Sequence, residues 1–152
     1  MKVMTNIGTM FPFDRLTKEI DKIGDKKGFD ILAQIGDSKY VPKNVKYLSF
    51  ADPKIFTANA KKQDVIISHA GVGSIIELMS LNKRIILFPR LKKYGEAIDD
   101  HQLEICKAFN KKYGIEYTTN EKELFKIIKK KKNVKKIKKD SALLNEIKKL
   151  IN

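Results

Sequence analysis

The residues best suited to chemistry lie between positions 64 and 77, in the segment DVIISHAGVGSIIE. A short apolar run predicts a buried strand, and a helical pattern follows it after a turn of small residues. Such a turn places free backbone N–H groups and the positive end of a helix dipole at one point, which suits an anion. His69 adds a side-chain donor, Ser74 can act as N-cap or as a donor to phosphate, and Glu77 can accept ribose hydroxyls. Taken alone, the segment also fits a capped turn with a hydrogen-bonded structural histidine.

The rest of the chain alternates predicted strands and helices. The expected strands are 2–7, 29–35, 45–50, 64–68, 84–88 and 115–118, and the expected helices are 13–27, 53–62, 74–81, 99–112, 120–130 and 142–151. Continuous apolar strands separated by helices favour an α/β, Rossmann-like fold with a mainly parallel sheet covered on both faces. Ligands of such sheets bind at the carboxyl ends of the strands. The turns at Gly8, at His69 and after Pro89 should therefore converge on one rim.

Length and composition indicate one domain, residues 1–152, with an expected cytoplasmic or peripheral location. No apolar run approaches the roughly 20 residues that cross a bilayer, and the start of the chain does not resemble a signal peptide. Met1 leads directly into a predicted strand, which favours a whole gene product. Cys106 lies on an apolar helical face and is expected to be a small core residue rather than a nucleophile.

The net charge of +14 is concentrated near the C-terminus, where positions 126–139 hold nine lysines and no acid. A solvated helical face is one explanation, and attraction to an anionic membrane or an acidic partner is another. We expect no nucleic-acid binding, because no aromatic residues interleave with the lysines and no recognition motif is present.

Three blocks of sequence carry a family resemblance. They are NIGTMFPFD at 6–14, the turn at 69–77, and Phe88-Pro89 followed by DDHQLE at 99–104. Together they resemble the donor-binding half of GT-B glycosyltransferases, in particular the family 28 C-terminal domain. This domain occurs in the peptidoglycan N-acetylglucosaminyltransferase and as the donor-binding subunit of the split eukaryotic enzyme acting on dolichol diphosphate. The resemblance runs from the first residues to about Gly114.

The resemblance implies a UDP-sugar as donor substrate and assigns a group to each of its parts. Glu77 would bind the ribose, the backbone of Phe50 and Ala51 the uracil, and Gly8 and Thr9 would face the phosphates and the partner cleft. The diphosphate would be bound by Gly71, Val72, Gly73 and Ser74, with a contact from His69. The hexose hydroxyls would be read by Asp100, His101 and Gln102. Outside the His69 turn, a structural role is the alternative for each residue.

We expect no metal and no cofactor besides the sugar-nucleotide substrate. The sequence has no Asp-x-Asp pair at a strand end and no cluster of residues with metal-ligand spacing. Asp99 and Asp100 are adjacent, which is better explained by a sugar contact plus a helix cap. A helix N-terminus and fixed N–H donors can stabilise the departing nucleoside diphosphate without a metal.

The resemblance covers about half of a GT-B enzyme, which implies a two-component transferase. A membrane-anchored partner subunit would hold a polyprenyl-diphosphate-linked acceptor, supply the catalytic base and recruit this chain to the inner face of the membrane. The composition is closest to bacterial pairs of capsule and exopolysaccharide synthesis, and the amphipathic helix at 142–151 is a candidate docking element. A hexose or an N-acetylhexosamine would be transferred. The alternative is a non-enzymatic nucleotide-binding or scaffold module, although Glu77 and the 100–102 segment favour the enzyme.

Overall fold

The computed structural model describes residues 1–134 and 141–151, and within them six parallel strands form one sheet. The strands are β1 Lys2–Asn6, β2 Asp30–Gln34, β3 Lys46–Leu48, β4 Val65–Ser68, β5 Arg84–Leu87 and β6 Glu116–Tyr117. Their order is β3-β2-β1-β4-β5-β6, and every pairing is parallel. This confirms the predicted Rossmann-like fold. The chain leaves β1 in one direction and returns at β4 in the other, so the strand order reverses between these two strands.

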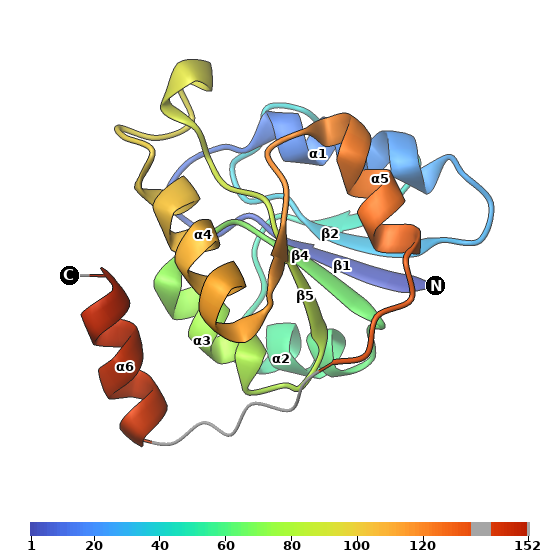
Figure 1. Cartoon of the computed structure of the whole chain (residues 1–152). Helices are drawn as coiled ribbons and strands as arrows, with labels where there is room; N and C mark the ends of the chain where they lie inside the picture. Colours follow the sequence, from blue (N-terminus) through green and yellow to red (C-terminus); the bar gives the residue numbers. More distant parts are fainter. Residues whose placement is uncertain (135–140, 152) are drawn as a thin grey trace.

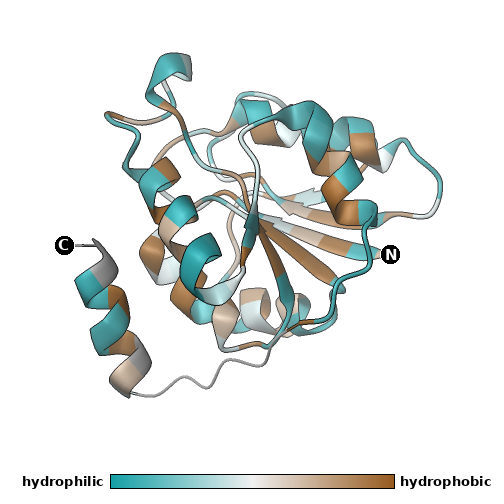
Figure 2. Cartoon of the chain, viewed as in Figure 1, coloured by the Kyte–Doolittle hydropathy of each residue, from teal (hydrophilic) through white to brown (hydrophobic). Residues whose placement is uncertain are grey.

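Helices cover both faces of the sheet, as Figure 1 shows. Their bounds are α1 Asp14–Gly24, α2 Pro53–Lys61, α3 Val72–Met79, the short 3-10 helix η1 Lys92–Tyr94, α4 His101–Tyr113, α5 Glu121–Lys129 and α6 Ser141–Ile151. One core cluster packs α1 and α5 against the sheet, and a second packs α2, α3 and α4 against the other face. The hydrophobic residues concentrate on the strands and on the inward sides of the helices (Figure 2).

Local capping explains where several helices begin. Asp52 caps α2 by accepting from the Lys54 N–H at 2.8 Å, and Pro53 takes the first helical position. Asn120 caps α5 in the same way through the Lys122 N–H at 2.9 Å. Helix α3 begins at Val72, two residues earlier than the sequence predicts.

Helix α6 packs against the domain that precedes it. Ile147 is 1% exposed and belongs to the core cluster on the α3 and α4 side, and Glu146 pairs with Lys112 of α4 at 3.1 Å. Ile147 is therefore buried in the core of this chain. A docking helix would instead leave it free to contact another protein. Of the lysine-rich segment 126–139, positions 126–134 are described, and positions 135–139 lie outside the described residues. Within the described residues no helix combines the length and the apolar character that a membrane span needs.

Candidate functional site at the carboxyl rim of the sheet

The candidate site lies where β1 and β4 end side by side. The His69 N–H donates to the Asn6 carbonyl at 2.9 Å, which continues the ladder one residue past β4. The Asn6 side chain folds back, with its Oδ1 accepting from the Gly8 N–H at 3.1 Å and its Nδ2 within 3.5 Å of the Ser68 hydroxyl. Asn6 and Ser68 were not predicted as site residues, yet they fix how the two turns leave the sheet.

Two glycines make room for the imidazole of His69 between these turns. Gly8 has a φ of +77°, and a Cβ placed there would lie 2.7 Å from the ring. A Cβ at Gly71 would also collide with the ring at Nε2. Both positions therefore require glycine, one for its left-handed backbone and both for the close approach of the ring. The prediction that the Gly8 and His69 turns meet is confirmed.

His69 is neutral, and its proton lies on the inner nitrogen. The side chain is 9% exposed, and this burial lowers the pKa of His69 to about 4. Its Nδ1 lies 3.3 Å from the Asn6 carbonyl, which can only accept, so Nδ1 carries the proton and donates it there. Nε2 is then an acceptor. The sequence predicts a side-chain donor at this position, whereas the folded chain presents a lone pair suited to a hydroxyl.

The first turn of α3 provides the backbone donors. Gly71 is the N-cap, and its carbonyl accepts from the Ile75 N–H at 3.0 Å. Of the two roles considered for Ser74, that of N-cap is wrong, because the helix begins two residues before it. Its role as a hydroxyl donor to phosphate stays a prediction. The N–H groups of Val72, Gly73 and Ser74 have no intrahelical acceptor by helix geometry. Gly73 faces open space, since a Cβ there would meet nothing within 4 Å.

Gln102 joins the turns that follow β4 and β5. Its Oε1 accepts from the Ala70 N–H and from the Arg90 N–H, both at 3.1 Å. The side-chain oxygen of Gln102, which is predicted to contact the hexose, is therefore already bonded to the backbone. Its amide nitrogen is the group left for a ligand.

The neighbouring acidic residues at the start of α4 also bind backbone. Asp100 accepts from the Lys92 N–H at 2.9 Å, and Asp99 accepts from the His101 N–H at 3.0 Å. Asp99 thus provides the side-chain cap near the helix start, although Asp100 occupies the N-cap position and makes no capping bond of its own. The expected cap is therefore confirmed only by position, since Asp100 is the N-cap and the side-chain bond to the helix start comes from Asp99 before it. Asp100 and His101 are exposed and remain predicted sugar contacts.

Arg90 is the main residue that sequence reasoning missed. Its guanidinium donates to the carbonyls of Ile7 at 2.7 Å, Phe11 at 2.5 Å and Pro12 at 2.6 Å. The side chain is 3% exposed, and burial lowers the pKa of Arg90 to about 10, with Glu96 acting in the opposite direction. The arginine thereby holds the turn after β1 against the end of β5. Its only signal in the sequence is a basic residue directly after Phe88-Pro89.

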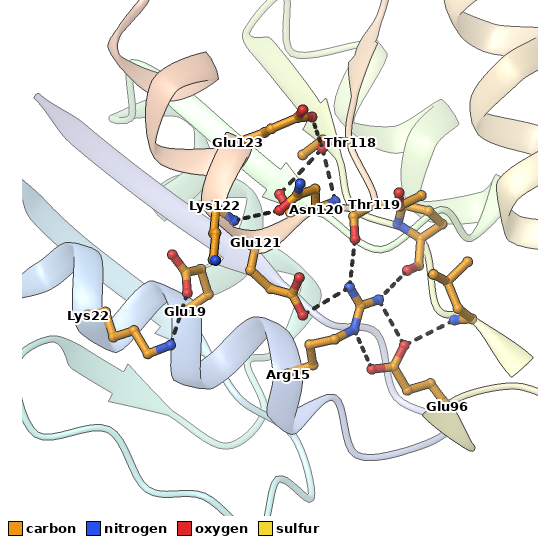
Figure 3. Close-up of polar contacts among 12 residues, drawn as sticks. Arg15, Glu19, Lys22, Glu96, Thr118, Thr119, Asn120, Glu121, Lys122 and Glu123 are labelled. Carbon is orange, nitrogen blue, oxygen red and sulfur yellow. Dashed lines mark hydrogen bonds and ion pairs between the residues drawn. The ribbon is translucent and has the colours of Figure 1, made fainter. Parts of the chain in front are cut away.

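A second arginine fixes the loop between β5 and α4. Arg15 of α1 forms a double contact with the carboxylate of Glu96, at 2.7 and 2.9 Å, and donates to the carbonyls of Pro89 and Thr119 (Figure 3). Glu96 also accepts from the Leu91 N–H at 3.0 Å. The start and the middle of the loop are thus tied to α1.

The remaining predicted residues lie farther out. Glu77 is exposed on α3, and Thr57 of α2 lies with its hydroxyl 3.4 Å from the Glu77 carboxylate. Phe50 is 48% exposed just before α2, and Ala51 packs partly against the core. Thr9 is exposed in the β1–α1 turn. The described contacts place Gly8 and Gly71 against His69 and tie Gln102 to the adjacent Ala70. They do not join the four outer residues to that group.

The site can therefore bind an anion at the α3 N-terminus, accept a hydrogen bond from a hydroxyl at His69 Nε2 and present the exposed Glu77 carboxylate one turn further along α3.

Cys106 takes no part in this site. It is fully buried, and burial raises the pKa of its thiol to about 12. The predicted core role is confirmed.

Comparison with known proteins agrees with this geometry. The model of the glycosyltransferase family 28 C-terminal domain matches residues 12–152. The UDP-N-acetylglucosamine transferase subunit ALG13 of Candida albicans is 38% identical over 68 residues, which are 45% of this chain and 22% of that protein. The matched part of the chain thus spans less than a quarter of the length of this relative.

Solved structures share the fold at lower identity. An NMR structure of ALG13 has a TM-score of 0.66 at 18% identity, and the match covers 96% of this chain and 94% of that one. The glycotransferase of kitacinnamycin and the calicheamicin glycosyltransferase CalG4 each have a TM-score of 0.62, at 17% and 11% identity. In both cases 99% of this chain matches 38% of the other, so this fold is one part of those larger enzymes. The family model covers nearly the whole sequence, and the chain belongs to the glycosyltransferase family 28 C-terminal domain family.

Proposed function

We propose that this chain is the donor-binding subunit of a two-component glycosyltransferase that uses a UDP-sugar. The observation that carries the proposal is the rim at the β1–β4 switch point. There the first turn of α3 presents free N–H groups, and Gln102 and Arg90 hold the surrounding turns in place. A family 28 domain with such a rim suits a nucleoside diphosphate.

In this proposal each part of the donor meets a different group. The diphosphate lies at the N–H groups of residues 72–74, and the ribose hydroxyls bind the Glu77 carboxylate. The uracil lies near Phe50 and Ala51. The hexose extends toward His69 and the amide of Gln102, where Nε2 accepts a sugar hydroxyl. Helix dipole and backbone donors stabilise the leaving UDP, so no metal ion is needed.

The acceptor belongs to a second protein. One domain cannot hold donor and acceptor in the reacting geometry from which much of the rate arises. The name of the ALG13 relative, a transferase subunit, supports an assembly with a partner. We propose a membrane-anchored partner that holds a polyprenyl-diphosphate-linked acceptor and supplies the base, with a hexose or N-acetylhexosamine transferred in polysaccharide synthesis.

Calorimetric titration with UDP tests the donor site. Glu77→Ala removes a charged acceptor, and each such bond contributes about 1.5–3 kcal/mol, so UDP affinity should fall at least about tenfold. The fold should be unaffected, because Glu77 is exposed. Asp30→Ala at the start of β2, which removes an exposed carboxylate paired with Lys46 at the opposite edge of the sheet, is the matched control and should bind UDP normally. Equal affinity of the Glu77 variant and the control would remove Glu77 from the site.

A transfer assay tests the need for a partner. The purified chain should bind UDP yet show little transfer to a lipid-linked acceptor, and addition of the partner should restore transfer. Efficient transfer by the chain alone would refute the two-component assembly. The non-enzymatic alternative predicts UDP binding with no transfer under either condition.

A further inference from the structure

A second hollow opens on the same rim, on the α1 side of the sheet. It has a volume of about 550 Å³ and lies between the β1–α1 turn, the start of α1 and the β5–α4 loop, which projects from the body of the domain in Figure 1. Its lining residues are Phe11, Pro12, Asp14, Arg15, Lys18, Lys39, Tyr94, Gly95 and Glu96. None of them belongs to the turn at 69–77, so the hollow is separate from the proposed donor site.

The walls of the hollow are held by contacts inside the chain. Arg15 and Glu96, which Figure 3 shows paired, join α1 to the β5–α4 loop at 2.7 Å with both side chains largely buried. The Arg15 guanidinium also lies 4.7 Å from the ring centre of Tyr94. Arg90 fixes the opposite wall through the carbonyls of Phe11 and Pro12. The shape of the hollow is therefore fixed by contacts within the chain.

The acids in this wall are held by hydrogen bonds and ion pairs within the chain, whereas two of its lysines form no ion pair with the described residues. Asp14 accepts from the Ser38 hydroxyl at 2.5 Å and from the Lys39 N–H at 3.0 Å, and Glu96 is held by Arg15. Lys18 and Lys39 are exposed, and neither amine forms an ion pair within residues 1–134 and 141–151. Lys18 lies 5.8 Å from the ring centre of Tyr40, and its charge helps to lower the pKa of Asp14 without a direct contact. Two ammonium groups are therefore available to an anion from outside.

Exposed apolar side chains are present in the two loops that border the hollow. Phe11 and Tyr94 line the hollow and are 47% and 50% exposed. Met10 and Ile98 are in the same two loops and are 79% and 83% exposed. Large apolar residues exposed to this extent, and gathered in two fixed loops, mark an interaction surface.

We propose that this hollow binds a lipid phosphate headgroup. Lys18 and Lys39 bind the phosphate, the rings of Phe11 and Tyr94 flank it, and Met10 and Ile98 meet the apolar chain. A free nucleotide would explain the lysines without the exposed Met10 and Ile98. An uncharged apolar partner would explain those two residues without the lysines. A phosphate-bearing lipid accounts for both, through charge complementarity at one end and apolar contact at the other.

The test measures co-sedimentation of the full chain with three kinds of vesicle: phosphatidylcholine alone, phosphatidylcholine with phosphatidylglycerol, and phosphatidylcholine with a small fraction of polyprenyl diphosphate. Lys18→Ala/Lys39→Ala removes the headgroup contacts, and Tyr94→Ala removes a wall without changing the charge. Lys61→Ala/Lys62→Ala, at the end of α2, is the matched control with the same loss of charge.

We expect the Lys18/Lys39 variant to bind phosphate-bearing vesicles about tenfold or more weakly, and the control to change less than about threefold. Tyr94→Ala should also bind them more weakly. A preference for phosphatidylglycerol identifies a bilayer headgroup, and a preference for polyprenyl diphosphate identifies the diphosphate end of the acceptor lipid that the partner holds by its remaining parts. Either result supports the proposal. Equal loss in the two double variants indicates general charge attraction and overturns it, as does unchanged binding.

UDP titration of the same variants keeps the two sites apart. UDP affinity should be unchanged in the Lys18/Lys39 variant, because neither lysine belongs to the donor site. A parallel loss of UDP binding would assign the hollow to the donor site and overturn the proposal. If the chain binds UDP normally but does not bind the vesicles, the lipid proposal is overturned and the donor-binding function stands.

Discussion

Removing the side-chain oxygen of Gln102 should destabilise the whole rim. In Gln102→Ala, the N–H groups of Ala70 and Arg90 lose their acceptor, and both residues are almost fully buried. An unsatisfied buried donor costs about 1–3 kcal/mol, so the two together should cost about 2–4 kcal/mol once some water enters beside this half-buried side chain. For a domain of this size the melting temperature should then fall by roughly 5–15 °C.

Gln102→Glu is the matched control. A carboxylate can accept from the same two N–H groups, and the residue is the second of α4, where the helix dipole favours a negative charge. Its melting temperature should remain close to that of the original chain. UDP affinity should fall in both variants, in the first because the turn before Gly71 loses its support and in the second because a negative charge faces the diphosphate.

Differential scanning calorimetry with UDP titration separates these effects. If Gln102→Ala melts within about two degrees of the original chain, the two hydrogen bonds do not support the rim. If that variant also binds UDP normally but loses sugar transfer, Gln102 acts on the hexose alone.

Four further outcomes follow from the described contacts. Burial lowers the pKa of His69 to about 4, so between about pH 6.5 and 4 His69 is protonated in the unfolded chain but not in the folded chain. The free energy of unfolding should therefore fall by about 3 kcal/mol as the pH drops over this range. In urea titrations, His69→Gln should lose this part of the pH dependence. Arg90→Met should cost at least about 3 kcal/mol, since three carbonyls lose their donor, and a loss below about 1 kcal/mol would contradict the role assigned to it. Burial raises the pKa of Asp21, but hydrogen bonds from the Tyr40 hydroxyl and two backbone N–H groups outweigh burial and leave this pKa below its usual value. Tyr40→Phe removes one of these bonds, so the chain should unfold at a higher pH during acid titration. Cys106 should resist alkylation at neutral pH until the chain is unfolded, and rapid modification of the folded chain would contradict its burial.

Local pattern in the sequence was enough to predict the elements and their order. Apolar runs and capping residues such as Asp52 and Asn120 act on neighbouring positions, so strands, helices and most boundaries follow from adjacent residues. The parallel sheet then requires the turns at Gly8 and His69 to meet, because carboxyl ends of parallel strands share one edge. The boundary of α3 was missed because a glycine N-cap at Gly71 has no side chain to mark it.

The tertiary structure alone decided how the rim is held and charged. Arg90 and Ile7 are 83 positions apart, and Ala70 and Gln102 are 32 apart, so no local pattern connects them. His69 is neutral because folding removes it from water and places its Nδ1 against the Asn6 carbonyl. Burial and long-range hydrogen bonds depend on which turns come together, and for that reason the residue types predicted a donor at His69 where the folded chain presents an acceptor.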